Sequence, residues 1–303
     1  MRIRTPAIVG LLAAAFLPIS PAQNPNRAAQ PVQLPAGVQS ELDIAYADES
    51  PAQKLDLYLP PGKANAPRPA IVVVHGGGWR SGDKQRGQWV RVPAQYASDG
   101  YVAMSVNYRL TGEAPWPAQI EDVKAAVRWL RAHAKKYGVD VDRIGAYGNS
   151  AGAHLVSLLG LVEQSDGLEG SGPHQEHSSM VQAVCASATP TDFLNWREPG
   201  VVPERLGRTF LAGPSDSLRD RARQASPITY ARGDAPPFLL IHGTADRTVP
   251  LSQSDRFAKA LREAGAKQVR YMIFDNETHG VFQRQRLLTY PAMKAFFADA
   301  LAQ

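Results

Sequence analysis

The chain has 303 residues, of which 44% are apolar, so it is long enough to bury the core of one large α/β domain. Charged residues make up 20%, which argues against a chain that is disordered throughout. The net charge is +5, and the basic residues form no cluster interleaved with aromatic side chains, so the sequence gives no support for nucleic-acid binding.

The first 22 residues have the pattern of a secretory signal peptide. Arg2 and Arg4 give a basic start, residues 7–17 form an apolar run, and residues 20–22 supply small side chains at the usual cleavage spacing. The apolar run is too short to span a bilayer, which takes ~20 residues. We therefore expect removal of residues 1–22, a net charge lowered from +5 to +3, and a secreted or periplasmic protein without membrane attachment. An uncleaved membrane anchor or a wrong start site is the alternative.

The globular domain is expected to begin near residue 41. Residues 23–40 are rich in Pro, Ala, Gln and Asn, which is typical of a loose arm after a cleavage site. Alternating apolar and polar residues at 42–46 and 54–59 then predict two strands that pair in antiparallel fashion at the start of a sheet. We expect a single domain over residues 41–303.

Strand-like and helix-like segments alternate through the rest of the chain. Residues 71–74 and 101–106 are short apolar runs, as expected of parallel strands buried on both faces. In the helix that opens at Pro117 and is expected to end at Gly138, apolar residues recur on one face. Further strands are expected at 143–147, 181–186, 238–242 and 269–274, with helices near 89–96 and 252–264. The alternation predicts an α/β fold whose mostly parallel central sheet carries helices on both faces.

Two segments interrupt this alternation. Residues 163–179 are polar and rich in glycine, and residues 193–230 combine a few large apolar side chains with many arginines. Long insertions in compact domains are often lids or binding loops, and residues 193–230 are our candidate for a lid or insert. A surface excursion without a role is the alternative for both segments.

The motif G-x-S-x-G occurs at residues 148–152, between a predicted strand and a predicted helix. A serine hydroxyl becomes a useful nucleophile only when it is held exposed beside a base. The glycines on either side of Ser150 leave room for the sharp turn that exposes the hydroxyl at the start of the helix. The sequence therefore predicts that Ser150 is a nucleophile.

A glycine run, Gly76 to Gly78, follows directly on the predicted strand at 71–74 and is flanked by His75 and Trp79. Acyl transfer builds negative charge on a carbonyl oxygen, and backbone N–H groups aimed at that oxygen stabilise it. Only glycine lets the backbone approach so closely. We expect the N–H groups of Gly77, Gly78 and Ala151 to form an oxyanion hole.

A serine nucleophile of this type needs an acid and then a histidine farther along the chain. Asp246 follows the predicted strand at 238–242, and His279 follows the strand at 269–274, so both emerge at the carboxyl ends of parallel strands. Asp275 and Glu277 are rival acids. They lie so close to His279 in sequence that their side chains would hardly reach the far nitrogen of the ring. The predicted triad is Ser150, Asp246 and His279.

Other reactive side chains are interpreted as structural. Cys185 is the single cysteine, which excludes an intrachain disulfide, and its apolar neighbours predict a buried strand. His174 and His177 could grip a metal ion, but no third ligand lies at a recognisable spacing, so we expect a solvated loop. No Walker loop or HExxH motif is present, and we expect neither a cofactor nor a metal.

At this point the chain resembles the α/β-hydrolase esterases near the hormone-sensitive lipase and the bacterial feruloyl and acetylxylan esterase-like families. The resemblance covers nearly all of residues 42–300. The motifs that carry it are HGGGW (75–79), NYRL (107–110), PAQIEDVKAAVRWLR (117–131), GNSAGAHL (148–155), PTDFL (190–194), ASPITY (225–230), HGTADRTVP (242–250) and THG (278–280). It implies the α/β-hydrolase fold and the same roles for Ser150, Asp246, His279 and the three oxyanion donors.

The chain departs from this resemblance at two positions beside the predicted pocket. Asn149 stands where relatives often carry an acidic residue or glycine, and Ala153 stands where many have glycine. Neither removes a catalytic group. We expect Trp79 and Asn149 to line the substrate pocket, and Trp116 is a further candidate.

The sequence predicts a serine esterase that hydrolyses short-chain carboxylic esters, small or carbohydrate-linked. Export and the resemblance point to acetyl or feruloyl esters of polysaccharide, and the charged residues of 193–230 argue against a lipase, which needs a large apolar face. An amidase, formamidase or peptidase of the same fold is the first alternative. A non-catalytic binding protein on this scaffold is the second. The oligomeric state is left open.

Overall fold

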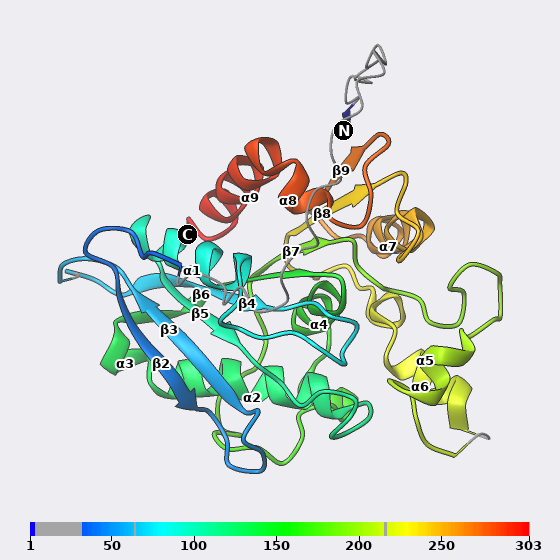
Figure 1. Cartoon of the computed structure of the whole chain (residues 1–303), viewed down its shortest axis with the longest axis horizontal. Coiled ribbons are helices and arrows are strands. Elements are labelled where there is room, and N and C mark those ends of the chain that lie inside the picture. Colours follow the sequence, from blue (N-terminus) through cyan, green and yellow to red (C-terminus); the bar gives the residue numbers. More distant parts are fainter. Residues whose placement is uncertain (4–31, 64, 215–216, 303) are drawn as a thin grey trace, which may run out of the picture.

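The structure, a computed structural model, describes residues 1–3, 32–63, 65–214 and 217–302 (Figure 1). Most of the predicted signal peptide, and residues 23–31 of the arm expected at 23–40, lie outside the described residues. The first strand after this gap, β2, begins at Gln39, two residues before the expected start of the domain at residue 41. No helix within the described ranges is long and apolar enough to cross a membrane.

Nine strands of the described chain form one sheet in the order β1-β9-β8-β7-β6-β4-β5-β3-β2. They are β1 (Arg2–Ile3), β2 (Gln39–Ala45), β3 (Lys54–Leu59), β4 (Arg68–Val74), β5 (Val102–Val106), β6 (Val139–Asn149), β7 (Ala183–Ser187), β8 (Phe238–Gly243) and β9 (Val269–Phe274). The pairs β2/β3 and β3/β5 are antiparallel and the other pairs are parallel, which confirms the expected antiparallel start and mostly parallel sheet.

Helices follow the strands along the chain and cover the sheet on both sides (Figure 1). They are α1 (Gln88–Ser98), α2 (Ala118–Ala132), α3 (Ala134–Tyr137), α4 (Ala151–Leu159), α5 (Glu204–Arg208), α6 (Leu218–Gln224), α7 (Leu251–Glu263), α8 (Val281–Arg284) and α9 (Arg286–Ala300). The helix expected to run from Pro117 to Gly138 is divided at His133, whose Nδ1 lies 2.8 Å from the carbonyl oxygen of Trp129. Gly138 ends α3 in the left-handed conformation, as a C-cap glycine does.

Two apolar cores lie on opposite faces of the sheet, because the side chains of each buried strand point alternately to either side. One core joins the sheet to α2, α4 and α7, through side chains such as Val123, Leu155 and Phe257. The other joins it to α1 and α9, through Tyr96 and Phe297 among others. The two-sided covering is the α/β-hydrolase arrangement that the sequence predicts.

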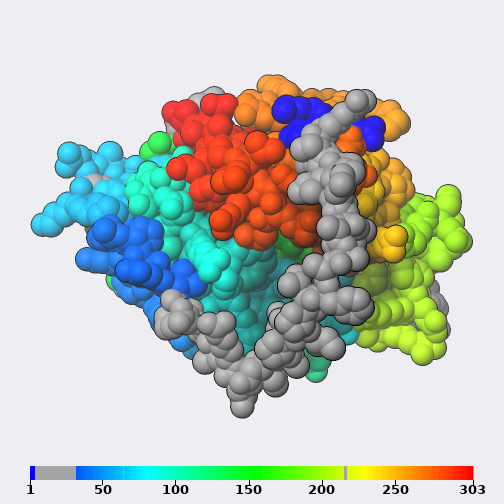
Figure 2. Space-filling model, turned by 45° about the horizontal axis from the view of Figure 1, so that its top comes forward, coloured from blue at the N-terminus to red at the C-terminus, as the bar shows by residue number. Residues whose placement is uncertain are grey.

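The parallel strands direct their carboxyl ends toward one edge of the sheet, and the connections after β4, β6, β8 and β9 meet there. The segment 193–230 lies beside this edge. Figure 2 shows it as the yellow-green flank of the molecule, on the opposite side from the blue β2 and β3. The buried Cys185 on β7 occupies the core position expected for it.

Candidate active site

Ser150 occupies the sharp turn between β6 and α4. Its backbone has φ 57° and ψ −122°, a conformation that a residue with a side chain adopts only under constraint. Steric packing supplies that constraint. A Cβ atom on Gly148 would stand 2.3 Å from the carbonyl carbon of Gly152, and one on Gly152 would stand 2.1 Å from the carbonyl oxygen of Val74. The two glycines of the motif are thus required by close backbone contacts, and the strained turn presents the Ser150 hydroxyl.

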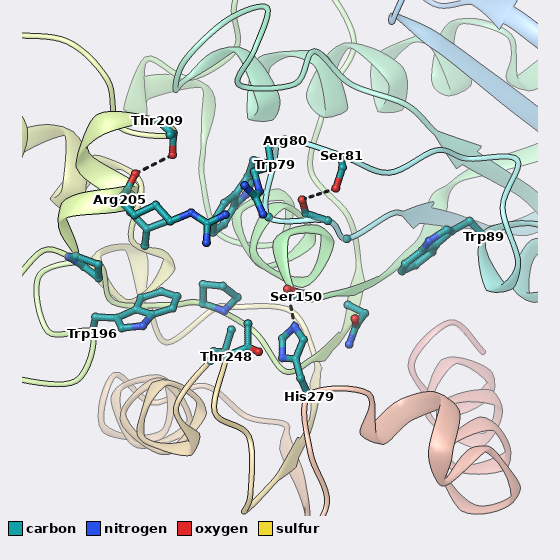
Figure 3. A pocket seen from close by; sticks show the side chains of 18 residues that line it. Trp79, Arg80, Ser81, Trp89, Ser150, Trp196, Arg205, Thr209, Thr248 and His279 are labelled. Atoms are coloured by element: carbon teal, nitrogen blue, oxygen red, sulfur yellow. Dashed lines mark hydrogen bonds between the residues drawn. The ribbon is translucent and has the colours of Figure 1, made fainter. Parts of the chain in front are cut away.

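The structure brings Ser150, His279 and Asp246 into one hydrogen-bonded chain. His279 Nε2 lies 2.9 Å from Ser150 Oγ (Figure 3). On the other side of the ring, His279 Nδ1 lies 2.7 Å from Asp246 Oδ2. Because a carboxylate only accepts, the ring proton resides on Nδ1, and Nε2 is left to accept the serine proton. The geometry is that of a nucleophile, a base and an orienting acid.

The Asp246 carboxylate is held on both oxygens. Its Oδ1 accepts the backbone N–H groups of Thr248 at 2.8 Å and Val249 at 3.0 Å. Burial acts to raise the pKa of this carboxyl, but hydrogen bonds from His242 and His279, the charge of His279 and the amide of Val249 outweigh burial and hold the pKa well below its usual range. Asp246 is therefore a fixed negative charge at neutral pH.

His242 is a member of this network that the sequence analysis interpreted only as the end of a strand. It is fully buried, and its Nε2 lies 3.0 Å from the carbonyl oxygen of Val249 and 3.3 Å from Asp246 Oδ2. Its Nδ1 lies 2.7 Å from Ser254 Oγ on α7. The carbonyl of Val249 requires the proton on Nε2, so that proton also faces the acid. The spacing of four residues between His242 and Asp246 was the signal in the sequence.

The rival acids contact other partners. Glu277 accepts hydrogen bonds from Arg284 Nε, at 2.8 Å, and from the side-chain amide of Gln285. Asp275 Oδ1 accepts one from Arg2 Nε at 2.7 Å. The carboxylate within hydrogen-bond distance of the His279 ring is that of Asp246.

The glycine run lies directly against the Ser150 turn. A Cβ atom on Gly76 would stand 2.6 Å from the carbonyl oxygen of Asn149, and Gly77 has φ 127°, where a Cβ atom would stand 1.8 Å from the carbonyl oxygen of Ser81. The loop is thus closed tightly on itself as well as on the turn. The backbones of Gly77 and Gly78 line the same cavity as Ser150. Ala151, the first residue of α4, is buried beside them.

Trp79 lines this cavity, although it is only 3% exposed. Its ring stacks on Phe210 with centroids 4.1 Å apart, and its Nε1 donates to His154 Nδ1 at 3.2 Å. Asn149 also lines the cavity, and its Nδ2 donates to the carbonyl oxygen of Ser187 at 3.3 Å. Trp116 does not line it: its Nε1 donates to Gln224 in α6, which turns the ring into the core.

The cavity in front of Ser150 has a volume of about 660 Å³. Sequence analysis did not identify several of its walls, because they come from segments distant in the chain. Trp89 stands on one side, and the segment 193–230 forms the other with Trp196 and Arg205 (Figure 3). Leu206 of the same segment also lines the cavity. Among the described residues, no group of three or more His, Cys, Asp or Glu side chains is arranged to hold a metal ion.

Comparison with known proteins gives a family and consistent relatives. The family model described as BD-FAE matches residues 55–261. Esterase LipC of Mycobacterium tuberculosis is 34% identical over 243 residues, which cover 78% of this chain and 59% of LipC. The probable carboxylic ester hydrolase LipM of the same organism is 33% identical over 233 residues, which cover 76% of this chain and 53% of LipM. The chain thus spans little more than half the length of these relatives.

Solved structures agree with the fold. A truncated form of a carbohydrate esterase from gut microbiota superposes with a TM-score of 0.78 at 30% identity, covering 88% of this chain and 97% of the other. An esterase from Thermogutta terrifontis, Est2, superposes with a TM-score of 0.71 at 29% identity, covering 87% of this chain and 92% of the other. The predicted α/β-hydrolase fold is confirmed.

Proposed function

Since the chain belongs to the BD-FAE family and has the fold of α/β-hydrolase esterases, we propose that it is a serine esterase that hydrolyses short-chain carboxylic esters. The observation that carries the proposal is the unbroken chain from Ser150 Oγ through the His279 ring to Asp246, at 2.9 Å and 2.7 Å, with the serine in an open cavity. The named esterases among its relatives support it.

The reaction consists of two acyl transfers. His279 Nε2 takes the Ser150 proton as Oγ attacks the ester carbonyl, and the oxyanion is stabilised by the backbone N–H groups of Gly77, Gly78 and Ala151. The ester C–O bond then breaks, and the alcohol leaves with the proton from His279. Water, deprotonated by the same nitrogen, attacks the acyl-enzyme and releases the acid and free Ser150. Asp246 stays ionised and stabilises the imidazolium in both steps.

The residues that line the cavity of Ser150 favour substrates with short acyl groups. Trp79 is packed against Phe210 and His154, which fixes its ring beside the oxyanion loop and limits the room there. Trp89 and Trp196 lie on different sides of Ser150 and offer apolar faces to a larger alcohol part (Figure 3). We propose acetyl or feruloyl esters of polysaccharide as the natural substrate class, with the enzyme secreted or periplasmic. The gut carbohydrate esterase supports the carbohydrate part.

The central test is Ser150→Ala. We expect kcat for 4-nitrophenyl acetate to fall by ~10⁴-fold or more while the circular dichroism spectrum stays unchanged, because the nucleophile alone is lost. The wild-type protein should be labelled by a fluorescent phosphonate and the variant should not. A folded variant with near-normal turnover would overturn the proposal, and a wild-type protein that neither turns over esters nor takes the label would indicate a binding protein.

The identity of the acid is tested by Asp246→Asn, which should lower kcat by ~10³-fold to 10⁴-fold because the ring of His279 is no longer held with its proton on Nδ1. Asp275→Asn is the matched control, since Asp275 and His279 both follow β9 while the His279 ring is bonded to Asp246. It should retain wild-type kcat. The reverse pattern would reassign the acid.

The substrate class is tested by comparing kcat/KM for 4-nitrophenyl acetate, butyrate and palmitate, with 4-nitroacetanilide as the amide. We expect acetate or butyrate to lead by a wide margin. A lead for palmitate would contradict the short-chain proposal, and a lead for the anilide would favour an amidase. Release of acetate or ferulate from xylan tests the carbohydrate part separately.

A further inference from the structure

Two arginines, Arg80 and Arg205, line the cavity that holds Ser150, and none of the described residues that line it is acidic. They reach it from different parts of the fold, Arg80 from the loop after β4 and Arg205 from α5 (Figure 3). Arg80 lies close to the oxyanion loop: a Cβ atom on Gly78 would stand 4.0 Å from its Nε. Positive charge is thus supplied to the mouth of the active site from two directions.

Among the described residues, no hydrogen-bond acceptor and no ion-pair partner contacts the guanidinium group of Arg80 or of Arg205. Arg208, one turn farther along α5, differs in this respect, because it pairs with Glu204 at 2.5 Å. Arg256 on α7 also has a partner, since its Nε lies 3.2 Å from Asp192 Oδ2. A guanidinium presents five N–H donors in a planar fork that matches a carboxylate, so two such groups on one cavity form a receptor for an anion.

The cavity walls strengthen the attraction of such an anion. Trp79, Trp196 and Leu206 line the same space and place apolar surface beside the two guanidinium groups. Apolar surface lowers the effective dielectric constant, and the attraction between opposite charges is inversely proportional to that constant. An anionic group bound between these walls would therefore gain more than it would at an open protein surface.

We propose that the preferred substrate is an acetyl ester whose alcohol part carries a carboxylate, held by Arg80 and Arg205. This inference rests on the proposed esterase function and adds the charge of the substrate to it. An acetyl group occupies only a few atoms, so the alcohol part fills most of the 660 Å³ and reaches the exposed arginines at the mouth. Within carbohydrate chemistry the alcohol is a sugar unit bearing or adjoining a uronate.

The test compares two acetyl esters of similar size, 4-acetoxybenzoate and 4-acetoxybenzamide, which differ in the charge of the alcohol part. The measured quantity is the ratio of the two kcat/KM values for each protein. Loss of active enzyme cancels within each ratio, and the different reactivity of the two esters cancels when a variant is compared with the wild type. Arg80→Gln and Arg205→Gln should each lower the ratio by about threefold to tenfold, because one charged hydrogen-bonding contact is lost. The double variant should lower it further.

Arg208→Gln is the matched control, because Arg208 lies on the same helix, is exposed and does not line the cavity. Its ratio should equal that of the wild type. Raising the salt concentration should lower the ratio in the wild type and leave the double variant almost unchanged, since the surviving difference is no longer electrostatic. An unchanged ratio in both cavity variants would overturn the proposal.

Arg205→Lys separates charge from shape. It keeps the positive charge without the planar fork, so its ratio should lie between those of the glutamine variant and the wild type. A lysine variant as low as the glutamine variant would overturn the assignment to charge. Acetylated glucuronoxylan and its carboxyl-reduced form then distinguish a polymer-borne carboxylate from a small one. Failure to turn over 4-nitrophenyl acetate would instead overturn the esterase function itself.

Discussion

The two segments that interrupt the strand-helix alternation, residues 163–179 and 193–230, are both long insertions and are used differently. The first contributes no side chain to the cavity of Ser150, whereas the second supplies one wall of it. The two segments pack on different helices and through different contacts. Buried charges hold the first, and aromatic rings and amide hydrogen bonds hold the second.

Residues 163–179 are attached to α2 by buried cations. Lys124 and Arg128, whose side chains are almost fully buried, both pair with Glu169, and Ser179 Oγ donates to the same carboxylate at 2.8 Å. Arg128 Nε also donates to the carbonyl oxygen of Pro173 at 3.2 Å. Each cation is satisfied only while this insertion stays in place. The segment therefore contributes to stability.

Residues 193–230 are closed at their base and packed from within. The N–H of Phe193 donates to Ser226 Oγ at 2.9 Å, which joins the two ends of the segment. Gln253 of α7 donates from Nε2 to the carbonyl oxygens of Asn195 and Trp196, each at 3.1 Å. Phe210 stacks on Trp79, so the segment packs directly against the residue that follows the oxyanion loop. It is therefore placed to contribute to substrate selection.

The largest test of this comparison is Glu169→Gln. The substitution leaves Lys124 and Arg128 buried without a counter-charge, and we expect the free energy of unfolding in urea to fall by about 3 kcal/mol. Glu176→Gln is the matched control in the same segment, because that side chain is 69% exposed, and it should change stability by less than about 0.5 kcal/mol. At temperatures where the protein is folded, kcat/KM for 4-nitrophenyl acetate should be unchanged in both. A folded Glu169→Gln variant with lost activity would place this segment in the active site after all.

The next test uses the link between the oxyanion loop and residues 193–230. His154 Nε2 donates to the carbonyl oxygen of Ala225 at 2.7 Å, so its Nδ1 accepts from Trp79 only while the ring is neutral. Burial lowers the pKa of His154 to about 3. Below pH 6.5 the His154 ring binds a proton in the unfolded chain but not in the folded chain. The free energy of unfolding therefore decreases as the pH is lowered from 6.5 toward the folded-state pKa of about 3. Between pH 7.5 and pH 5 this loss is about 2 kcal/mol.

Urea unfolding at the two pH values checks this prediction. His154→Gln should lose less stability between pH 7.5 and pH 5 than the wild type does, by about 2 kcal/mol. His177→Gln, in the other insertion, should show the wild-type loss, because that ring is half-exposed in a polar loop. Equal losses in all three proteins would mean that His154 carries a proton in the folded state and that the link is misassigned.

The smallest expected effect concerns the aromatic wall. Trp196 stacks on Phe193 with centroids 5.8 Å apart and lines the cavity. Trp196→Ala should lower kcat/KM for 2-naphthyl acetate by about threefold to tenfold relative to ethyl acetate, because an aromatic contact with the alcohol part is lost. Val201→Ala, in the same segment but 48% exposed and outside the cavity lining, is the control and should leave this ratio unchanged. A parallel loss for both esters in Trp196→Ala would indicate a structural role only.

Local patterns in the sequence sufficed for the sheet and for the three residues that the structure brings together. Apolar runs predicted the parallel strands, and parallel strands place their carboxyl ends at one edge, so Ser150, Asp246 and His279 were expected to meet there. The geometry brings them within hydrogen-bond distance. Their roles as nucleophile, acid and base are part of the proposed function and await the variants described above.

Only the tertiary structure decided which of two similar insertions faces the active site. That choice depends on partners more than 40 residues away in the sequence, such as Lys124 for Glu169 and Gln253 for Trp196, and composition carries no record of them. The same holds for the two arginines at the cavity mouth, Arg80 and Arg205, which come from the loop after β4 and from α5. Strands and tight turns are specified by the side chains of a few neighbouring residues, whereas cavity walls form where distant segments pack together, and for that reason the sequence determined the chemistry at the strand ends and the fold determined what surrounds it.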